Sequence, residues 1–319
     1  MLQEAREPAR PPGTPWVVLV SNKVGSGVAR RVVYIAVTAV VLIAVAAGIA
    51  FLQLGWEEGG SAGLLVVVTF PGLKSDVELI ACSGDRVIEI YNPGVDPHEA
   101  QLDPRAARMV AEADIVVTGG HTPADLKAAE LASGTVVDVT RIPGIEILET
   151  PDGSPNLHYP IYHPENYRLF LSRLAEAMQE KRPECDYIGN LRVALKKLED
   201  LERLQGLLKG SEAVADHPAA QYPAHWLGAE VVLIIGGGEE WAPTVQELEK
   251  AERLLASGSV AFITVDDSGV PVSKAGEWLL REAERLGASV ILVKAPYTEG
   301  SIIDKLSYIA VQIEEGIYG

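Results

Sequence analysis

The chain has 319 residues, enough for about two domains, and apolar residues make up 48% of it, enough to fill hydrophobic cores. Charged residues account for 22%, which is typical of a globular protein and argues against a disordered chain. The formal net charge of −17 argues against nucleic acid as the main partner, because binding phosphates requires a basic surface. Two cysteines are too few for a zinc site made of cysteines alone or for a disulfide scaffold.

An uncharged apolar segment lies near the N-terminus. Val32 to Leu52 spans 21 positions without a charge, which is long enough to cross a hydrocarbon core of about 30 Å as a helix. Two arginines precede this segment and two glutamates follow it, so the positive-inside rule places residues 1–31 in the cytoplasm and everything after residue 56 outside. We therefore expect an uncleaved membrane anchor over residues 32–56, with cleavage near Gly60 and secretion as the alternative.

Beyond this segment, short apolar runs alternate with stretches of helical periodicity. The pattern predicts strands at residues 64–70, 87–91, 115–117, 136–139, 231–235, 260–265 and 289–293. It predicts helices at residues 105–113, 126–132, 166–180, 185–209, 244–257, 274–286 and 302–317. Such alternation is typical of mostly parallel sheets. The sequence therefore predicts two parallel-sheet α/β lobes, residues 64–180 and 211–319, joined by a long spine helix over residues 181–210 that would limit hinge motion.

All the histidines follow the apolar segment: His98, His121, His158, His163, His217 and His225. His98 and His121 come just after predicted strands, the position at which α/β sheets bind ligands. Three of the six adjoin a proline, whose fixed backbone suits a ligand that must be pre-aimed. Neutral imidazole binds Zn, Mn or Fe with a carboxylate to complete the shell, so the histidines are interpreted as metal ligands or as surface and capping residues.

Several stretches resemble one known family. Val66 to Pro104, which contains Gly-Val-Asp-Pro-His ending at His98, closely resembles the zinc- and manganese-binding solute-binding proteins of ABC importers, the ZnuA/TroA-like or adhesin-type family. His158 to Asn166, Asp216 to Tyr222 and Lys274 to Pro296 are similar to later motifs of that family. The resemblance covers almost all of residues 64–319 and implies the two-lobed, metal-type periplasmic-binding-protein fold.

The resemblance also implies four metal ligands: His98, His158, His217 and Glu299. His163 is a rival for the second ligand, because it falls where the family has an aspartate, and Asp304 is a rival for the fourth. His121 and His225 match no ligand of the family, and we expect His121 to lie in a loop or on the wall of the cleft.

This ligand set implies binding rather than catalysis. Two ligands from each lobe would place the metal in a shared cleft, and three imidazoles with one carboxylate leave no obligatory open position. The resemblance thus implies a non-enzymatic, monomeric outer domain that captures Zn²⁺ or Mn²⁺ outside the cell and delivers it to an ABC transporter permease. The alternatives are a membrane-anchored binding protein or sensor of the same fold for another ligand, and a zinc hydrolase with Glu239 or Asp266 as its base. The choice between Zn and Mn, and the pairing of Cys82 with Cys185, stay open.

Overall fold

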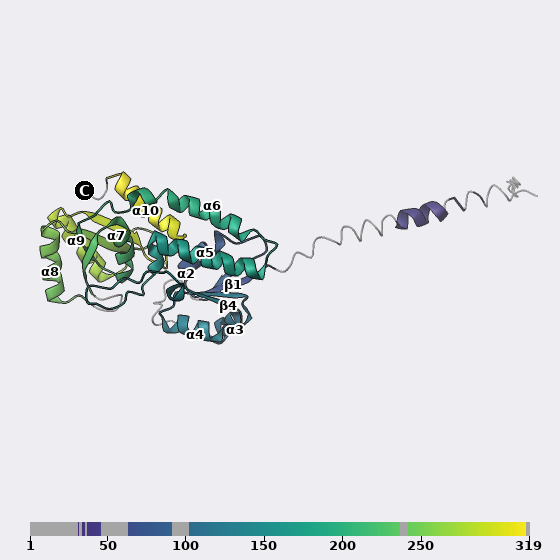
Figure 1. Cartoon of the computed structure of the whole chain (residues 1–319), viewed down its shortest axis with the longest axis horizontal. Helices are drawn as coiled ribbons and strands as arrows, with labels where there is room; N and C mark the ends of the chain where they lie inside the picture. The colour runs from purple at the N-terminus through teal and green to yellow at the C-terminus, as the bar shows by residue number, and fades with distance from the viewer. Residues whose placement is uncertain are drawn as a thin grey trace, which may run out of the picture. The chain divides into compact units, whose positions relative to one another are not determined.

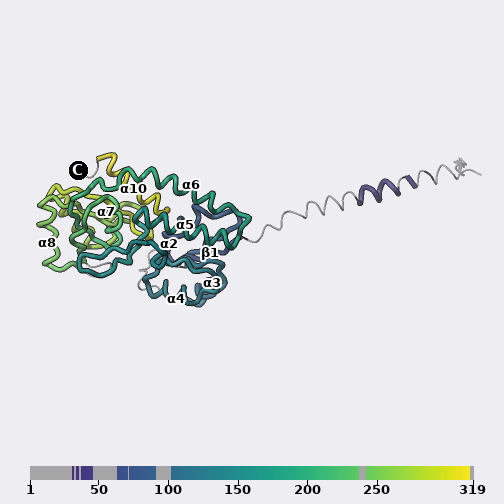
Figure 2. Tube along the Cα trace, viewed as in Figure 1, coloured from purple at the N-terminus to yellow at the C-terminus, as the bar shows by residue number. Residues whose placement is uncertain are grey.

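A computed structural model of the chain describes residues 31, 34–35, 37–45, 63–90, 102–236 and 242–316 (Figures 1 and 2). The chain divides into two compact units, Met1–Gly59 and Gly60–Gly319. In the first unit, residues 34–35 and 37–45 are helical, and no helix among the described residues is long and apolar enough to cross a membrane. The rest of the predicted anchor, residues 32–33, 36 and 46–56, lies outside the described residues.

The second unit begins with a four-stranded parallel sheet in the order β2-β1-β3-β4. Its strands are β1 (Leu65–Val68), β2 (Arg86–Glu89), β3 (Ile115–Thr118) and β4 (Thr135–Asp138). Its helices are α2 (Pro71–Glu78), α3 (Pro104–Glu112), α4 (Pro123–Leu131) and α5 (Pro164–Lys181). Alternate residues of β1 face opposite sides: Val67 packs in a cluster with residues of α3 and α4, whereas Val66 and Val68 pack in the cluster that includes α2 and α5. This sheet with helices on both faces is the first lobe (Figure 1).

The second lobe repeats the same topology, with a parallel sheet in the order β6-β5-β7-β8. Its strands are β5 (Glu212–Ala215), β6 (Glu230–Ile234), β7 (Val260–Val265) and β8 (Val290–Lys294). Its helices are α7 (Gln221–Leu227), α8 (Val245–Ala256), α9 (Lys274–Leu286) and α10 (Ile302–Glu314). The two predicted parallel-sheet lobes are therefore confirmed.

The linking helix is shorter than the sequence pattern predicts. Helix α6 (Tyr187–Glu199) is followed by a short 3₁₀ turn, η3 (Glu202–Leu204), instead of continuing to Lys209. The chain leaves the helix because the N–H of Gly206, at φ +72°, donates to the carbonyl of Trp226, and that of Leu208 donates to Leu227. Helix α6 also lies alongside α5 instead of standing alone as a spine (Figure 2).

One hydrophobic core runs through both lobes. It joins side chains of the first sheet, α2 and α5 to side chains of α7, α10 and the second sheet. Gly72 of α2 shows how closely the lobes approach, because a Cβ on this residue would lie 2.1 Å from the carbonyl oxygen of Pro296, after β8. The lobes are thus packed against each other through buried apolar surface rather than linked only by a flexible connection.

Buried polar bonds cross the same contact region, which we call the seam and define by Asp76, Asn156, Tyr162, Gln221 and Ile302. The carboxylate of Asp76 accepts from Tyr167 Oη at 2.6 Å within the first lobe and from the N–H of Ile302, the first residue of α10, at 2.8 Å. Tyr162 Oη donates to the carbonyl of Lys294 at 2.5 Å. These bonds hold the second lobe at a fixed position against the first.

Asn156 adds further hydrogen bonds between the lobes, next to α7. Its Nδ2 donates to the carbonyl of Pro218 and to Oε1 of Gln221, both at 2.8 Å. Gln221 in turn donates to the carbonyl of Glu149 at 2.8 Å. The loop before α5 is thus bonded directly to the second lobe, and the limit on hinge motion stays a prediction that these bonds support in addition to the linking helix.

Cys82 and Cys185 form a disulfide that ties the end of α2 to the start of α6, with their Cα atoms 6.4 Å apart. The bridge closes a loop with a sequence separation of 103 residues. A bridge over such a loop restricts the unfolded chain, which is worth up to about 4 to 5 kcal/mol in the chain-entropy account.

We predict that a Cys82→Ser/Cys185→Ser double variant will unfold at lower denaturant concentration than the native chain, because its unfolded state regains that entropy. Urea unfolding followed by circular dichroism, with and without reductant, measures the loss. Reductant should destabilise the native chain and leave the double variant unchanged. Equal midpoints for the oxidised native chain and the variant would show that the bridge does not stabilise the fold.

A second prediction concerns Asp76, which is fully buried and whose pKa burial raises to about 7. Because its folded pKa lies above its unfolded value, Asp76 stabilises the fold most at low pH, and this contribution is lost as pH rises from about 4 to 7. The loss amounts to at most about 4 kcal/mol. In Asp76→Asn the side-chain oxygen can still accept from Tyr167 and Ile302, and the titration is removed. The stability of this variant relative to the native chain should therefore increase between pH 4 and pH 7, and a constant difference would contradict the assignment.

Candidate metal centre

Two imidazoles from different lobes meet at the seam. The rings of His158, in the loop before α5, and His217, after β5, lie edge to face with their centroids 5.6 Å apart. The structure thus brings together two of the residues that the sequence predicts as ligands, and it places them on the two sides that the resemblance implies.

The end of β5 positions His217. It follows Asp216, a buried carboxylate that accepts from the N–H of Thr264 at 2.8 Å and from its hydroxyl at 2.9 Å, fixing the strand end against β7. Burial raises the pKa of Asp216 to about 6. His217 is itself buried, at 8% exposure, and its Nδ1 accepts from the N–H of Ala219 at 3.0 Å, which caps the following 3₁₀ turn η4 (Pro218–Ala220).

This capping bond fixes the tautomer of the His217 ring. A neutral imidazole has one donor and one acceptor nitrogen, so with Nδ1 accepting, the proton lies on Nε2. A metal that binds Nε2 requires that proton to move to Nδ1 and the bond from Ala219 to break. A metal bound at Nε2 of His217 would therefore require a local change at the start of η4.

A strained turn positions His158. Its N–H donates to Oδ1 of Asn156 at 3.0 Å, so the residue that bonds to the second lobe also holds the backbone of the histidine. The next residue, Tyr159, adopts φ +60°, the only positive φ among the non-glycine residues that the structure describes. Such a conformation costs about 1–3 kcal/mol and persists where the surroundings enforce it, which is common at functional sites.

His163, the rival for the second ligand, lies elsewhere. Its ring is 5.3 Å from that of His225, and its Nδ1 accepts from the N–H of Glu165 at 3.3 Å, capping α5. Burial, and then the neighbouring His225, lowers its pKa to about 4, so His163 is neutral at ordinary pH. The geometry therefore favours His158 over His163 as the partner of His217.

The two candidate carboxylates, Asp304 and Glu299, differ in their hydrogen bonds and in their exposure. Asp304 accepts from the N–H and hydroxyl of Ser301 at 2.8 and 2.7 Å, forming the capping box that begins α10. Glu299 has an exposed side chain, and its N–H donates to Asp267 at 3.5 Å. Asp304 is thus engaged in starting a helix, whereas Glu299 lies on an accessible loop beside the seam.

His98 lies outside the described residues, as does Glu239. Among the residues that the structure does describe, no three histidine, cysteine or carboxylate side chains converge on one point at metal-binding distance. The four-residue ligand set of the resemblance therefore stays a prediction, of which the structure brings together His158 and His217.

His121 lies in a loop next to this pair, in agreement with the expectation that it lies in a loop or on the wall of the cleft. Its ring is 5.1 Å from that of His158, so His158 lies between two imidazoles. The sequence signal that was available is the pattern Thr122-Pro-Ala-Asp125, a capping box that begins α4 and fixes the loop carrying His121. The sequence does not predict His121 as a ligand, because the family resemblance assigns no metal ligand to this position.

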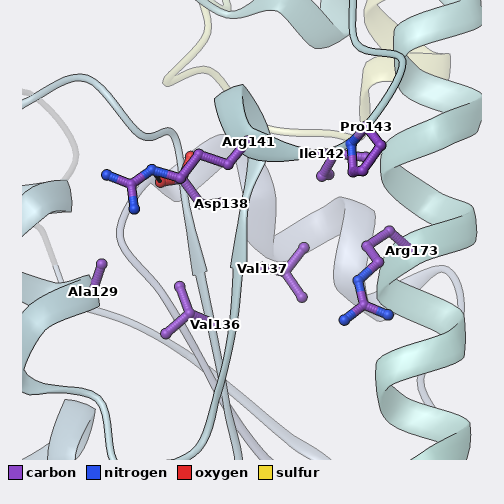
Figure 3. A pocket seen from close by; sticks show the side chains of 8 residues that line it. All are labelled: Ala129, Val136, Val137, Asp138, Arg141, Ile142, Pro143 and Arg173. Carbon is purple, nitrogen blue, oxygen red and sulfur yellow. Dashed lines mark ion pairs between the residues drawn. The ribbon is translucent and has the colours of Figure 1, made fainter.

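A pocket of about 400 Å³ lies in the first lobe, but it is a different feature (Figure 3). It is lined by Ala129, Val136, Val137, Asp138, Arg141, Ile142, Pro143 and Arg173. Arg141 pairs with Asp138 at 3.2 Å, and none of the lining residues is a histidine. This pocket is therefore not the place where the histidines meet.

Comparisons with known proteins agree with the geometry. A family model described as "Zinc-uptake complex component A periplasmic", ZnuA, matches residues 66–311. No curated protein sequence matches this chain. Similar solved structures include a ZnuA (20% identity, 80% of this chain and 99% of that one, TM-score 0.62). They also include the periplasmic zinc-binding protein TroA from Treponema pallidum (17% identity, 81% and 100%, TM-score 0.62).

A third similar structure is the solute-binding protein FpvC from Pseudomonas aeruginosa in complex with Mn²⁺, at 19% identity over 80% of this chain and 99% of that one, with a TM-score of 0.62. At these identities the structural likeness establishes the shared fold. The family model, which spans more than three quarters of the sequence, establishes membership. The chain therefore belongs to the ZnuA family of zinc- and manganese-binding solute-binding proteins, and it binds a divalent transition metal for an ABC importer.

Proposed function

We propose that the transported metal is held at the seam by the imidazoles of His98, His158 and His217 and by the carboxylate of Glu299. The observation that carries this proposal is the 5.6 Å approach of His158 and His217 across the two lobes. Imidazole nitrogens suit Zn²⁺, and a carboxylate oxygen also suits Mn²⁺, so both metals fit this donor set. Movement of the side chains of His158 and His217, with release of the cap at Ala219, would bring their ring nitrogens onto one ion.

The same residues favour binding over hydrolysis. A zinc hydrolase needs a carboxylate or histidine beside the metal to act as a general base. The carboxylate of Asp266, one candidate, accepts from the N–H groups of Ser268 and Val270 at 2.8 and 2.9 Å, which closes its own turn. We therefore propose that the chain has no hydrolytic role and that its metal is cargo.

We further propose that the two lobes work outside the cytoplasm, joined to the membrane by an anchor over residues 32–56, and that they deliver the metal to the importer's permease. The charge pattern around the apolar segment supports this topology. The disulfide between Cys82 and Cys185 supports it independently, because disulfides persist in oxidising compartments.

We predict that Zn²⁺ will stabilise the chain against thermal unfolding, by about 4 kcal/mol at a thousandfold excess over Kd. His158→Ala and His217→Ala should each remove most of that shift, because each variant deletes a ligand from one side of the seam. Calorimetry with and without Zn²⁺ measures it. His225→Ala is the matched control, because His225 is exposed and pairs with His163, so it should leave the shift intact. A full shift in both His158→Ala and His217→Ala would refute the proposed site.

We also predict that residues 57–319, expressed alone, will be soluble and will bind Zn²⁺ like the full chain, because they contain the whole of the compact unit Gly60–Gly319. Size-exclusion chromatography and the same thermal shift test both statements. Aggregation of this fragment, alongside a well-ordered full chain in detergent, would show that the proposed boundary is wrong.

A further inference from the structure

We infer that His121 is an additional imidazole ligand of the transported metal and biases the site toward Zn²⁺ over Mn²⁺. This inference rests on the proposed function, since it adds a donor to the same site. Its first support is position: the ring lies 5.1 Å from that of His158, and the side chain is 11% exposed. A mostly buried imidazole beside a proposed ligand needs only a small movement to reach the same ion.

The loop that carries His121 is held by a single buried carboxylate. Asp125 accepts from the N–H of Gly119 at 3.2 Å, of His121 at 3.3 Å and of Thr122 at 3.1 Å, and also from the hydroxyl of Thr69. These bonds join the ends of β1 and β3 to the start of α4, so the backbone of His121 is fixed before any metal arrives. Binding sites need donors that are held in this way.

The turn before His121 also requires a glycine. Gly120 adopts φ +86°, and a Cβ on this residue would lie 2.1 Å from Oδ1 of Asp138. Any other residue at position 120 would therefore displace the loop, and the side chain of His121 with it. The chain thus has a turn that directs one imidazole toward the seam.

The surroundings of the ring favour a metal-binding tautomer. Nδ1 of His121 lies 3.9 Å from Oδ2 of Asp125, too far for a hydrogen bond but close enough for the negative charge to favour a proton on Nδ1. A metal-binding histidine usually donates its other ring N–H to such a carboxylate, and a small movement of the ring would form that bond. In His217, by contrast, Nδ1 accepts a hydrogen bond from the N–H of Ala219, so the proton lies on Nε2.

A third imidazole beside His158 and His217 changes which metal the site prefers. Together the three rings supply three nitrogen donors. Nitrogen-rich shells favour Zn²⁺ over Mn²⁺, which is bound best by oxygen ligands. His121 would therefore act as a specificity-determining residue, present in this chain where the family resemblance assigns no ligand.

The test measures how many imidazole rings bind the zinc ion. The purified full chain is stripped with chelator, loaded with one equivalent of Zn²⁺ and studied by X-ray absorption at the zinc edge, in parallel with His121→Gln. The variant should show one imidazole fewer than the native chain, and its Zn²⁺ affinity, measured by chelator competition, should fall at least about tenfold, as expected when a direct ligand is lost. His225→Gln should match the native chain in both measurements.

A second variant separates ligation from a merely structural role. His121→Glu replaces the nitrogen donor by an oxygen donor, so it should bind one metal ion and shift the Zn²⁺/Mn²⁺ affinity ratio toward Mn²⁺. An unchanged imidazole number and an unchanged Zn²⁺/Mn²⁺ ratio in both His121 variants would overturn the inference. That outcome would leave the proposed function standing, which fails only if His158→Ala and His217→Ala still bind metal.

Discussion

Asp76 joins the two lobes at a place where its carboxylate has no exposure to solvent. It accepts from Tyr167 on one side and from the first N–H of α10 on the other, so the lobes cannot separate there without leaving buried polar groups unpaired. Lys305 lies in the same region, donating to the carbonyl of Pro296 at 2.9 Å, and burial lowers its pKa to about 8. Any wide opening of the seam would therefore expose the hydrophobic core shared by the two lobes and would also break the hydrogen bonds of Asp76.

A closed seam determines how a metal can be captured. If the lobes stay packed, the ion must be bound by local movements of histidine rings and of the loops that carry them. The side chains that would move extend from three elements: the 3₁₀ turn capped by His217, the strained turn after His158 and the exposed loop of Glu299. Strands β3 and β5 and the bonds of Asp125, Asn156 and Asp216 hold the backbones of the histidines in place.

Much of the fold was predictable from the sequence because buried parallel strands have a strong local signal. Val260 to Val265 is apolar throughout and forms β7, as expected. Strand β5, Glu212–Ala215, was missed because two of its four residues are alanines, which carry little strand propensity. Helix α6 was predicted too long because the amphipathic pattern continues past Glu199, and only the tertiary bonds of Gly206 and Leu208 to the end of α7 divert the chain.

The site was predictable only in part. Motifs with a family resemblance point to His158 and His217, and the structure places these two together. The local sequence could not decide between His158 and His163 as the second ligand, because both lie in the same proline-rich loop. The difference appears only in the structure, where His158 contacts His217 and His163 contacts His225. The sequence predicts His121 in a loop or on the wall of the cleft, but it could not predict the approach of its ring to His158, because this contact joins two loops that are 37 positions apart in the sequence.

We propose that one metal ion is bound between the lobes by His158 and His217, and anomalous diffraction at the zinc edge, on crystals of the chain loaded with one equivalent of Zn²⁺, would locate that ion. We expect a single strong peak at about 2.0–2.1 Å from a ring nitrogen of each of these two histidines. A peak at the His163–His225 pair, with none between His158 and His217, would contradict it.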